Sequence, residues 1–316
     1  MDTKLFQDKF SENQLFLFNE EREIRIDIKR EDLLHPEVSG NKLRKLQYNL
    51  KEAQSLRHDT ILTYGGAFSN HIAATAAAGN ISGYKTIGII RGEELGLDIE
   101  KTLKLNRTLA TAQVHGMHLY FVTRNDYRLK ETSSFKDRLK KRFGRFYDIP
   151  EGGTNDLAVK GTMEILTNRD KKQYDIIAVA AGTGGTAAGI IKSAAVNQKV
   201  FVYGALRGEF LKEEIAKYSL STDFEFYDDK RFGGYAKSDN ELIEYMNSRF
   251  RESGIPLDPI YTSKLLYGIE QMIENRVIKG KTRILAIHTG GLQSIAGYNQ
   301  KLAQKGRPII SYADHI

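Results

Sequence analysis

Apolar runs alternate with helical patterns along most of the chain, and this alternation predicts the fold. Residues 176–181 form a continuous apolar run, as expected for a strand buried on both faces, and 199–205 is predicted to be a further buried strand. The pattern predicts further strands at 60–64, 85–90, 119–122 and 283–288. Helical spacing predicts helices at 42–56, 72–78, 101–111, 134–143, 155–167 and 239–252, one ending near 275, and one after 291. Strands that alternate with helices indicate an α/β protein with parallel sheets.

Two regions are described less well by these periods. The first 38 residues read as extended segments and turns, in which residues 23–29 alternate polar and apolar as in a half-buried strand. The segment 147–153 has no clear period, and we interpret it as a crossing between domains.

A turn at Gly40 delivers Lys42 into the first turn of a helix, for which Asn41 is the expected N-cap. Lys42 shares a helix face with Leu46, whereas Arg44 points away. Burial and the positive end of the helix dipole both lower the pKa of a lysine placed there. The neutral amine is the nucleophile that Schiff-base chemistry needs. The alternative, which the turn alone leaves open, is a solvated lysine in a basic helix.

The Gly-rich segment 182–189 follows a buried strand and opens a helix, so its backbone N–H groups can hold a phosphate. A close-packed turn is the alternative. A P-loop requires Gly-Lys-Ser/Thr at its end, and this segment has none. The chain does contain Gly280-Lys281-Thr282, but that sequence precedes a predicted strand instead of following one. The spacing fits the looser dinucleotide fingerprint, but 205–207 lacks the acidic residue that binds ribose. We therefore predict a phosphate site without a recognised ribose.

A second Gly-rich loop, Gly65-Gly66, precedes Ser69, Asn70 and His71 and then an Ala-rich helix. This helix start either binds a second anion, such as a substrate carboxylate, or is simply capped by Ser69. There is no Gly-x-Ser-x-Gly elbow, so Ser69 is not interpreted as an acyl-transfer nucleophile. His71 has no partner at metal-ligand spacing and is expected to have a capping or structural function.

A lysine at a helix start, a phosphate loop and a second anion-binding loop together suggest pyridoxal phosphate. The order of the motifs resembles the 1-aminocyclopropane-1-carboxylate deaminase/D-cysteine desulfhydrase family of fold-type II pyridoxal-phosphate enzymes, from about Ile28 to Gly297. The motifs are Ser39-Gly40-Asn41-Lys42-Leu43-Arg44-Lys45-Leu46, Gly65-Gly66-Ala67-Phe68-Ser69-Asn70-His71, Ile149-Pro150-Glu151-Gly152-Gly153-Thr154-Asn155, Gly182-Thr183-Gly184-Gly185-Thr186, Asp258-Pro259-Ile260-Tyr261 and His288-Thr289-Gly290-Gly291.

The resemblance implies a function for individual residues. Lys42 matches the lysine that forms a Schiff base with the cofactor and later moves the α-proton. Asn70 matches the asparagine bonded to the cofactor's phenolate oxygen, and Ser69 the serine near the substrate carboxylate. Together with His71, these two residues are the predicted substrate-binding positions. Phe68 departs from the family, which usually has a glutamine there.

The other implied positions concern the phosphate and two tyrosines. Tyr235 and Tyr261 resemble the pair of active-site tyrosines. The residues that match the family's phosphate site are Lys45 and the loop formed by Gly182, Thr183, Gly184, Gly185 and Thr186.

Two cofactor-binding positions, Thr262 and Thr289, distinguish branches of the family. The cyclopropane deaminases carry a glutamate and a leucine there, so the threonines look like the desulfhydrase branch. A neutral threonine supports a protonated pyridine nitrogen less, which suits elimination of a good leaving group. The resemblance thus implies a D-cysteine desulfhydrase-like lyase that releases pyruvate and ammonia from D-cysteine or a related small amino acid. The alternatives are a 1-aminocyclopropane-1-carboxylate deaminase and, in another class, a nucleotide-binding α/β domain.

We expect two domains, each with a central parallel sheet flanked by helices, and the cofactor in the cleft between them. The small domain is predicted at 48–148, and the large one combines 1–47 with 149–316. The resemblance also implies a homodimer.

Composition changes this interpretation little. The net charge of +7 is spread along the chain, and no nucleic-acid-binding signature accompanies it. The chain has no cysteine, which excludes thiolate catalysis and Cys-based metal sites, and we predict no metal. No signal peptide or membrane span is recognisable, so a cytoplasmic protein is expected.

Overall fold

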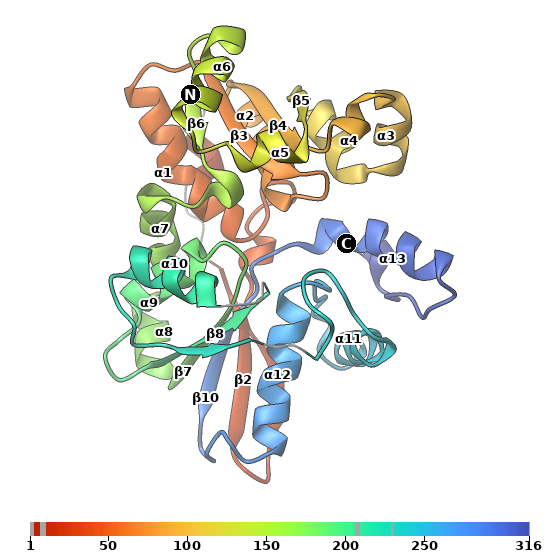
Figure 1. Cartoon of the computed structure of the whole chain (residues 1–316). Coiled ribbons are helices and arrows are strands. Elements are labelled where there is room, and N and C mark those ends of the chain that lie inside the picture. Colours follow the sequence, from red (N-terminus) through yellow and green to blue (C-terminus); the bar gives the residue numbers. More distant parts are fainter. Residues whose placement is uncertain (1–2, 7–10, 206–208, 229–230, 316) are drawn as a thin grey trace.

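Two β-sheets organise the part of the chain that the computed structural model describes, namely residues 3–6, 11–205, 209–228 and 231–315 (Figure 1). The larger sheet has six strands in the order β1-β2-β10-β7-β8-β9, and all neighbours are parallel except β1 and β2. Its strands are β1 (Asn13–Asn19), β2 (Ile24–Lys29), β7 (Ile176–Ala181), β8 (Lys199–Gly204), β9 (Glu225–Tyr227) and β10 (Arg283–Ile287). Two residues discussed above, Leu206 and Arg207, lie outside the described residues.

The smaller sheet has four parallel strands in the order β5-β4-β3-β6. They are β3 (Thr60–Gly66), β4 (Lys85–Arg91), β5 (His118–Val122) and β6 (Tyr147–Ile149). The α/β class with parallel sheets is thereby confirmed. Strand β6 belongs to the segment without clear period and lies across the expected domain boundary at 148, so the division of the chain into domains stays a prediction.

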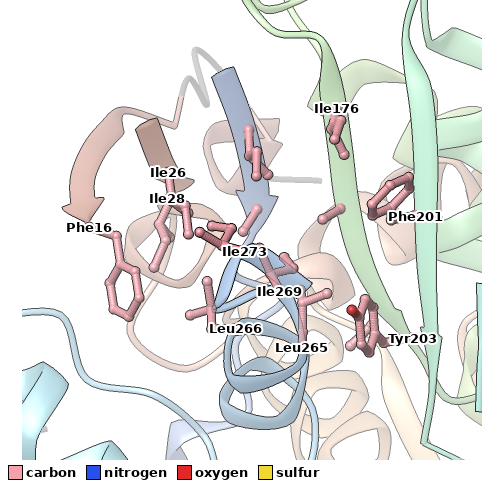
Figure 2. Close-up of a cluster of buried hydrophobic side chains, with 14 of the residues drawn as sticks. Phe16, Ile26, Ile28, Ile176, Phe201, Tyr203, Leu265, Leu266, Ile269 and Ile273 are labelled. Carbon is pink, nitrogen blue, oxygen red and sulfur yellow. The ribbon is translucent and has the colours of Figure 1, made fainter. Parts of the chain in front are cut away.

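The large sheet is buried on both faces, which explains its continuous apolar strands. Helix α12 (Thr262–Glu274) covers one face, because Leu265, Leu266, Ile269 and Ile273 recur at helical spacing and pack on the strands (Figure 2). The opposite face is covered by α9 (Gly185–Ser193) and α10 (Glu209–Ser219). Each fully buried side chain of this size contributes about 1.5–3 kcal/mol.

Helices also cover both faces of the small sheet (Figure 1). Helices α1 (Asn41–Ser55) and α2 (Asn70–Ile81) pack on one face and α5 (Arg124–Arg128) and α6 (Ser133–Phe143) on the other. No helix among the described residues has the length and apolar character needed to cross a membrane.

Several boundaries differ from the predicted ones. The helix expected at 101–111 is two helices, α3 (Ile99–Leu105) and α4 (Arg107–Val114), because the side chain of Asn106 accepts the Leu109 N–H and starts a new helix. Strands β1 and β9 and helix α10 were not expected individually. The remaining helices are α7 (Asp156–Thr162), α8 (Asn168–Gln173), α11 (Asn240–Ser253) and α13 (Ile295–Gln304).

Strand β2 is not half-buried as its alternation suggested. Its polar residues Asp27 and Lys29 are 3% and 1% exposed. Lys29 pairs with Asp170 at 2.8 Å, and Asp27 accepts the Tyr174 hydroxyl at 2.8 Å. The alternation therefore separates an apolar buried face from a polar buried face, where every charge has a partner.

The start of α1 also differs from the prediction. Gly40, with φ 65°, is the N-cap, and Asn41 is the first helical residue. A Cβ on Gly40 would lie 2.1 Å from the Thr289 carbonyl oxygen, so only glycine fits the turn. Arg44 is buried as well, because its guanidinium donates to the Glu31 carboxylate at 2.9 and 3.0 Å. The close contact with Thr289 fixes where α1 begins.

Candidate active site

A cavity of about 390 Å³ lies at the carboxyl ends of strands from both sheets. Its wall includes Gly66 at the end of β3, Arg91 at the end of β4 and Ala181 at the end of β7. The two Gly-rich loops singled out in the sequence both contribute to it, and so do Thr289, Gly290 and Gly291 of the motif after β10. This is where open parallel sheets place ligand sites.

Most of the predicted site residues, which are far apart in the sequence, line this one cavity. Those in its wall are Lys42, Lys45, Ser69, Asn70, His71, Gly182, Thr183, Gly184, Thr186, Tyr235, Tyr261 and Thr289. Two others, Gly185 and Thr262, are not in the wall. Gly185 lies directly behind it, since a Cβ there would be 3.3 Å from Lys45 Nζ. Thr262 is fully buried, and its hydroxyl has no hydrogen-bond partner among the described residues.

The amine of Lys42, at the start of α1, is hydrogen-bonded to the neighbouring residue. Its Nζ donates to Asn41 Oδ1 at 2.7 Å. Burial lowers the pKa of Lys42 from 10.5 to about 8, against a raising effect of the Asp258 carboxylate. The neutral amine is thus accessible near physiological pH, as a nucleophile or a base requires.

The loop from Gly182 to Thr186 has the geometry of an anion cradle. Gly184 adopts a left-handed conformation with φ 82°, and α9 begins directly after it. Lys45 Nζ points at the same place and donates only to neutral groups: the Gly152 carbonyl at 2.9 Å and the hydroxyls of Thr154 at 3.0 Å and Thr183 at 3.4 Å. Burial, together with the charge on Lys42, holds the pKa of Lys45 well below its usual value. A buried lysine whose described hydrogen-bond partners are all uncharged fits the phosphate group of a cofactor, which would supply the missing negative charge.

Asn41 joins the cradle to Lys42. Its Nδ2 donates to Thr186 Oγ1 at 2.7 Å while its Oδ1 accepts from Lys42. This use of the side chain, inside the first helical turn, explains why Asn41 does not cap α1. The amide thus links the amine to the Gly182–Thr186 loop.

The start of α2 presents unpaired polar groups to the cavity. Ser69 occupies the N-cap position, but its hydroxyl makes no capping bond. Asn70 Oδ1 is buried without a hydrogen-bond partner among the described residues. An unpaired helix start of this kind suits an anionic ligand such as a carboxylate.

His71 is buried in its neutral form. It is 1% exposed, and its Nε2 lies 2.8 Å from the Thr63 hydroxyl, which itself donates to the Ile149 carbonyl. That hydroxyl therefore accepts from Nε2–H. Burial, with the charges of Lys42 and Lys45, keeps the pKa of His71 well below 6.5, so the imidazole is neutral.

Two tyrosines of the cavity wall lie next to each other. The hydroxyls of Tyr235 and Tyr261 are 3.3 Å apart. Burial is the main cause that raises the pKa of Tyr261 well above 10, and the neighbouring Tyr235 adds to it. The hydroxyl of Tyr261 therefore stays protonated and can donate a hydrogen bond. Tyr261 also lies against the Gly182–Thr186 loop, since a Cβ on Gly182 would be 3.2 Å from its hydroxyl oxygen.

Some residues of the site were not identified from the sequence. Asp258 is fully buried and accepts the backbone N–H groups of residues 260, 261 and 262 at 2.8–2.9 Å, which fixes the start of α12. Its position three residues before Tyr261 is a capping signal that could have identified it. Arg91 and Glu151 also line the cavity; Glu151 belongs to the motif at 149–155, but the sequence indicated no function for either residue.

Comparison with known proteins identifies the family of the chain. The family model described as pyridoxal-phosphate dependent enzyme matches residues 13–290. A putative 1-aminocyclopropane-1-carboxylate deaminase of Pyrococcus horikoshii is 32% identical over 307 residues, covering 91% of each chain. A bifunctional D-cysteine desulfhydrase/1-aminocyclopropane-1-carboxylate deaminase, mitochondrial, of Arabidopsis thaliana is 31% identical, covering 84% of this chain and 72% of its own.

Solved structures agree with the fold. One, described as an ACC deaminase homologue, has a TM-score of 0.78 at 28% identity and covers 93% of each chain. A hydrogen sulfide-producing enzyme of Fusobacterium nucleatum has a TM-score of 0.61 at 14% identity, covering 92% of this chain and 98% of its own, and supports the fold alone. The family match leaves the nucleotide-binding alternative without support. The chain therefore belongs to the pyridoxal-phosphate dependent enzymes of fold type II, in the family of 1-aminocyclopropane-1-carboxylate deaminase and D-cysteine desulfhydrase.

Proposed function

We propose that the enzyme eliminates sulfide from D-cysteine or a closely related small amino acid, with pyruvate and ammonia as the other products. The observation that carries this proposal is the neutral character of Thr289 in the cavity wall and of the buried Thr262 beside Tyr261. When the α-proton is removed, the electron pair of the α-C–H bond stays on the substrate and must be stabilised. Elimination of a thiolate needs less of this stabilisation than opening a carbon ring does.

Lys42 is the base in this proposal. When bound, pyridoxal phosphate supplies an electron sink for the pair left by the α-C–H bond. The Lys42 amine, with its pKa lowered to about 8, takes the α-proton at Nζ. Asn41 Oδ1, 2.7 Å from Nζ, accepts a hydrogen bond from the ammonium that results. The charge on Lys42 is thus held in place between proton transfers.

The start of α2 positions the substrate in this proposal. The α-carboxylate is bound by Ser69 and by the N–H groups at the N-terminus of α2, where the helix dipole favours a negative charge. With the carboxylate fixed there, Lys42 addresses one face of the α-carbon, which selects one enantiomer. The Tyr261 hydroxyl, kept protonated by burial, donates a hydrogen bond near the reacting atoms.

The carboxylates in the cavity wall and directly beside it have other partners. Asp258 is occupied by three backbone N–H groups, and Glu151 pairs with Lys130 at 3.3 Å. The neutral hydroxyls of Thr262 and Thr289 are therefore the candidates to face the cofactor's ring nitrogen in this proposal. This arrangement supports a weaker electron sink and hence a substrate with a good leaving group.

The proposal is tested by parallel assays on the purified holoenzyme. D-cysteine is expected to yield sulfide and pyruvate, whereas 1-aminocyclopropane-1-carboxylate is expected to yield little 2-ketobutyrate because its ring carbons are poor leaving groups. Efficient 2-ketobutyrate release by the wild-type enzyme would favour the deaminase instead. The deaminase is the second candidate function because the names of the relatives from Pyrococcus horikoshii and Arabidopsis thaliana include this activity.

Replacing both threonines is expected to shift activity toward ring opening. Thr262→Glu with Thr289→Leu places a carboxylate where the Thr262 hydroxyl has no described partner, and this carboxylate would support a protonated ring nitrogen. The measurement is the ratio of 2-ketobutyrate to sulfide for the double variant, with Thr289→Leu alone as control. A ratio equal to that of the wild type in a folded, cofactor-loaded double variant would contradict the branch assignment.

The rate at which the apoprotein combines with pyridoxal phosphate is expected to rise with pH and to level off above about pH 8. Only the neutral amine of Lys42 attacks the cofactor's aldehyde, and burial brings the pKa of Lys42 down to about 8 from 10.5. Below that pH most of the amine is protonated, so the rate falls about tenfold per pH unit. The measurement is the rise of visible absorbance after mixing, between pH 6.5 and 9.5. A rate that is still climbing tenfold per unit at the upper limit would show an ordinary lysine.

A further inference from the structure

Arg91 is a charged residue of the cavity wall to which the proposed reaction assigns no function. It is the last residue of β4, in register with Gly66 of β3 and Val122 of β5. A Cβ on Gly66 would be 3.4 Å from its Nη2, so the guanidinium lies along the β3 end from which the loop to α2 departs. Arg91 thus reaches the cavity beside the turn that leads to Ser69.

The charge of Arg91 is not neutralised within the described part of the chain. Its guanidinium lies over the ring of Tyr127, 5.7 Å from the centroid, and makes no ion pair with a described carboxylate. Other arginines of the same region are paired, Arg124 with Glu94 at 2.5 Å and Arg138 with Asp126 at 2.7 Å. The one carboxylate in the cavity wall, Glu151, is bound by Lys130. The cavity therefore presents a positive charge in addition to Lys42 and Lys45.

We propose that Arg91 binds an anionic group on the substrate's β-substituent, so that the enzyme accepts small D-amino acids with a negatively charged leaving group. This inference rests on the proposed function, in which the α-carboxylate is bound at the start of α2. The planar guanidinium fork matches a carboxylate or a sulfate ester through two parallel hydrogen bonds. The guanidinium also lies over the aromatic ring of Tyr127, a cation–π contact that favours this position of the side chain.

The reaction balances for such a substrate as it does for D-cysteine. The α-proton passes to Lys42, and the bond from the β-carbon to the substituent breaks. The substituent leaves with the electron pair of that bond, as sulfate from D-serine O-sulfate. One water molecule then hydrolyses the remainder to pyruvate and ammonium, with no oxidant or reductant.

The test compares two ligands that differ only in the anionic group, D-aspartate and D-alanine, by calorimetric binding to the holoenzyme. The wild type is expected to bind D-aspartate about tenfold more tightly, on the scale of one hydrogen-bonded charge pair. Arg91→Met should remove this preference and Arg91→Lys should keep part of it. Arg142→Met is the matched control, because the Arg142 guanidinium also lies over a ring, 4.6 Å from the Tyr120 centroid, but outside the cavity wall.

A turnover assay complements the binding experiment. For Arg91→Met, kcat/KM for D-serine O-sulfate should fall about tenfold more than kcat/KM for β-chloro-D-alanine, whose substituent is neutral. Lys301→Met tests a rival cation, since Lys301 Nζ lies 4.0 Å from the ring centroid of Phe68 in the cavity wall.

Three results would overturn the inference: no preference for D-aspartate in the wild type, a preference that survives in Arg91→Met, or one that is lost in Lys301→Met instead. Failure of the proposed function looks different. In that case neither D-cysteine nor D-serine O-sulfate is consumed, while the Arg91-dependent binding preference persists.

Discussion

Replacing Lys42 with alanine is expected to abolish turnover, by at least about 10³-fold, since both the covalent anchor of the cofactor and the proposed base are lost. The visible absorption of the bound cofactor should disappear. Borohydride reduction, which traps a cofactor joined to an amine, should label the wild-type chain at Lys42 and leave the variant unlabelled. Mass mapping of the labelled peptide is the measurement.

Two comparisons make this prediction sharp. Lys51→Ala is the matched control, because Lys51 lies on the same helix but is exposed and outside the cavity wall. It should keep absorption, label and activity. A label on Lys45, which is buried in the same cavity, would move the anchor there and contradict the assignment of Lys42.

Gly184→Asp is expected to weaken cofactor binding by several kcal/mol. The change sets a carboxylate against the phosphate and removes room at a left-handed position with φ 82°. The loss is about 3 kcal/mol or more, from a charge-assisted hydrogen bond and new repulsion between like charges. The measurement is the dissociation constant of pyridoxal phosphate from the apoprotein, by fluorescence titration.

Gly184→Ala separates charge from backbone strain. Its Cβ meets the same neighbour, Ile215 Cγ1 at 3.0 Å, and has the same strained φ, but it brings no carboxylate. Binding by the alanine variant should therefore be weakened less than binding by the aspartate variant. Unchanged cofactor occupancy in folded Gly184→Asp would refute a phosphate site at this loop.

The fold class followed from local patterns. The apolar run of β7 and the helical spacing of Leu265, Leu266 and Ile269 in α12 are set by which faces each element buries. Patterns of this kind are visible in a single stretch of chain, because periods of 2 and 3.6 residues are local properties. The short strand β9 has only three residues, too few for any period to be recognised.

The resemblance determined the candidate residues, and parallel-sheet geometry explains why so many of them line one cavity. Loops that follow parallel strands leave the sheet at the same edge. Lys42 and the loops after β3, β7 and β10 were therefore predictable as neighbours without any knowledge of side-chain contacts.

Only the tertiary structure decided which polar groups are paired. The sequence shows Asp27 and Lys29 as ordinary charges, yet each is buried against a partner far along the chain. Arg91 looks no different in the sequence, yet it makes no ion pair with the described carboxylates and lines the cavity. Pairing depends on distances between segments remote in sequence, which no local period encodes. For this protein, the sequence alone thus determined the fold class, the family and the edge of the sheets that holds the site, while long-range packing decided the charge that the cavity presents to its substrate.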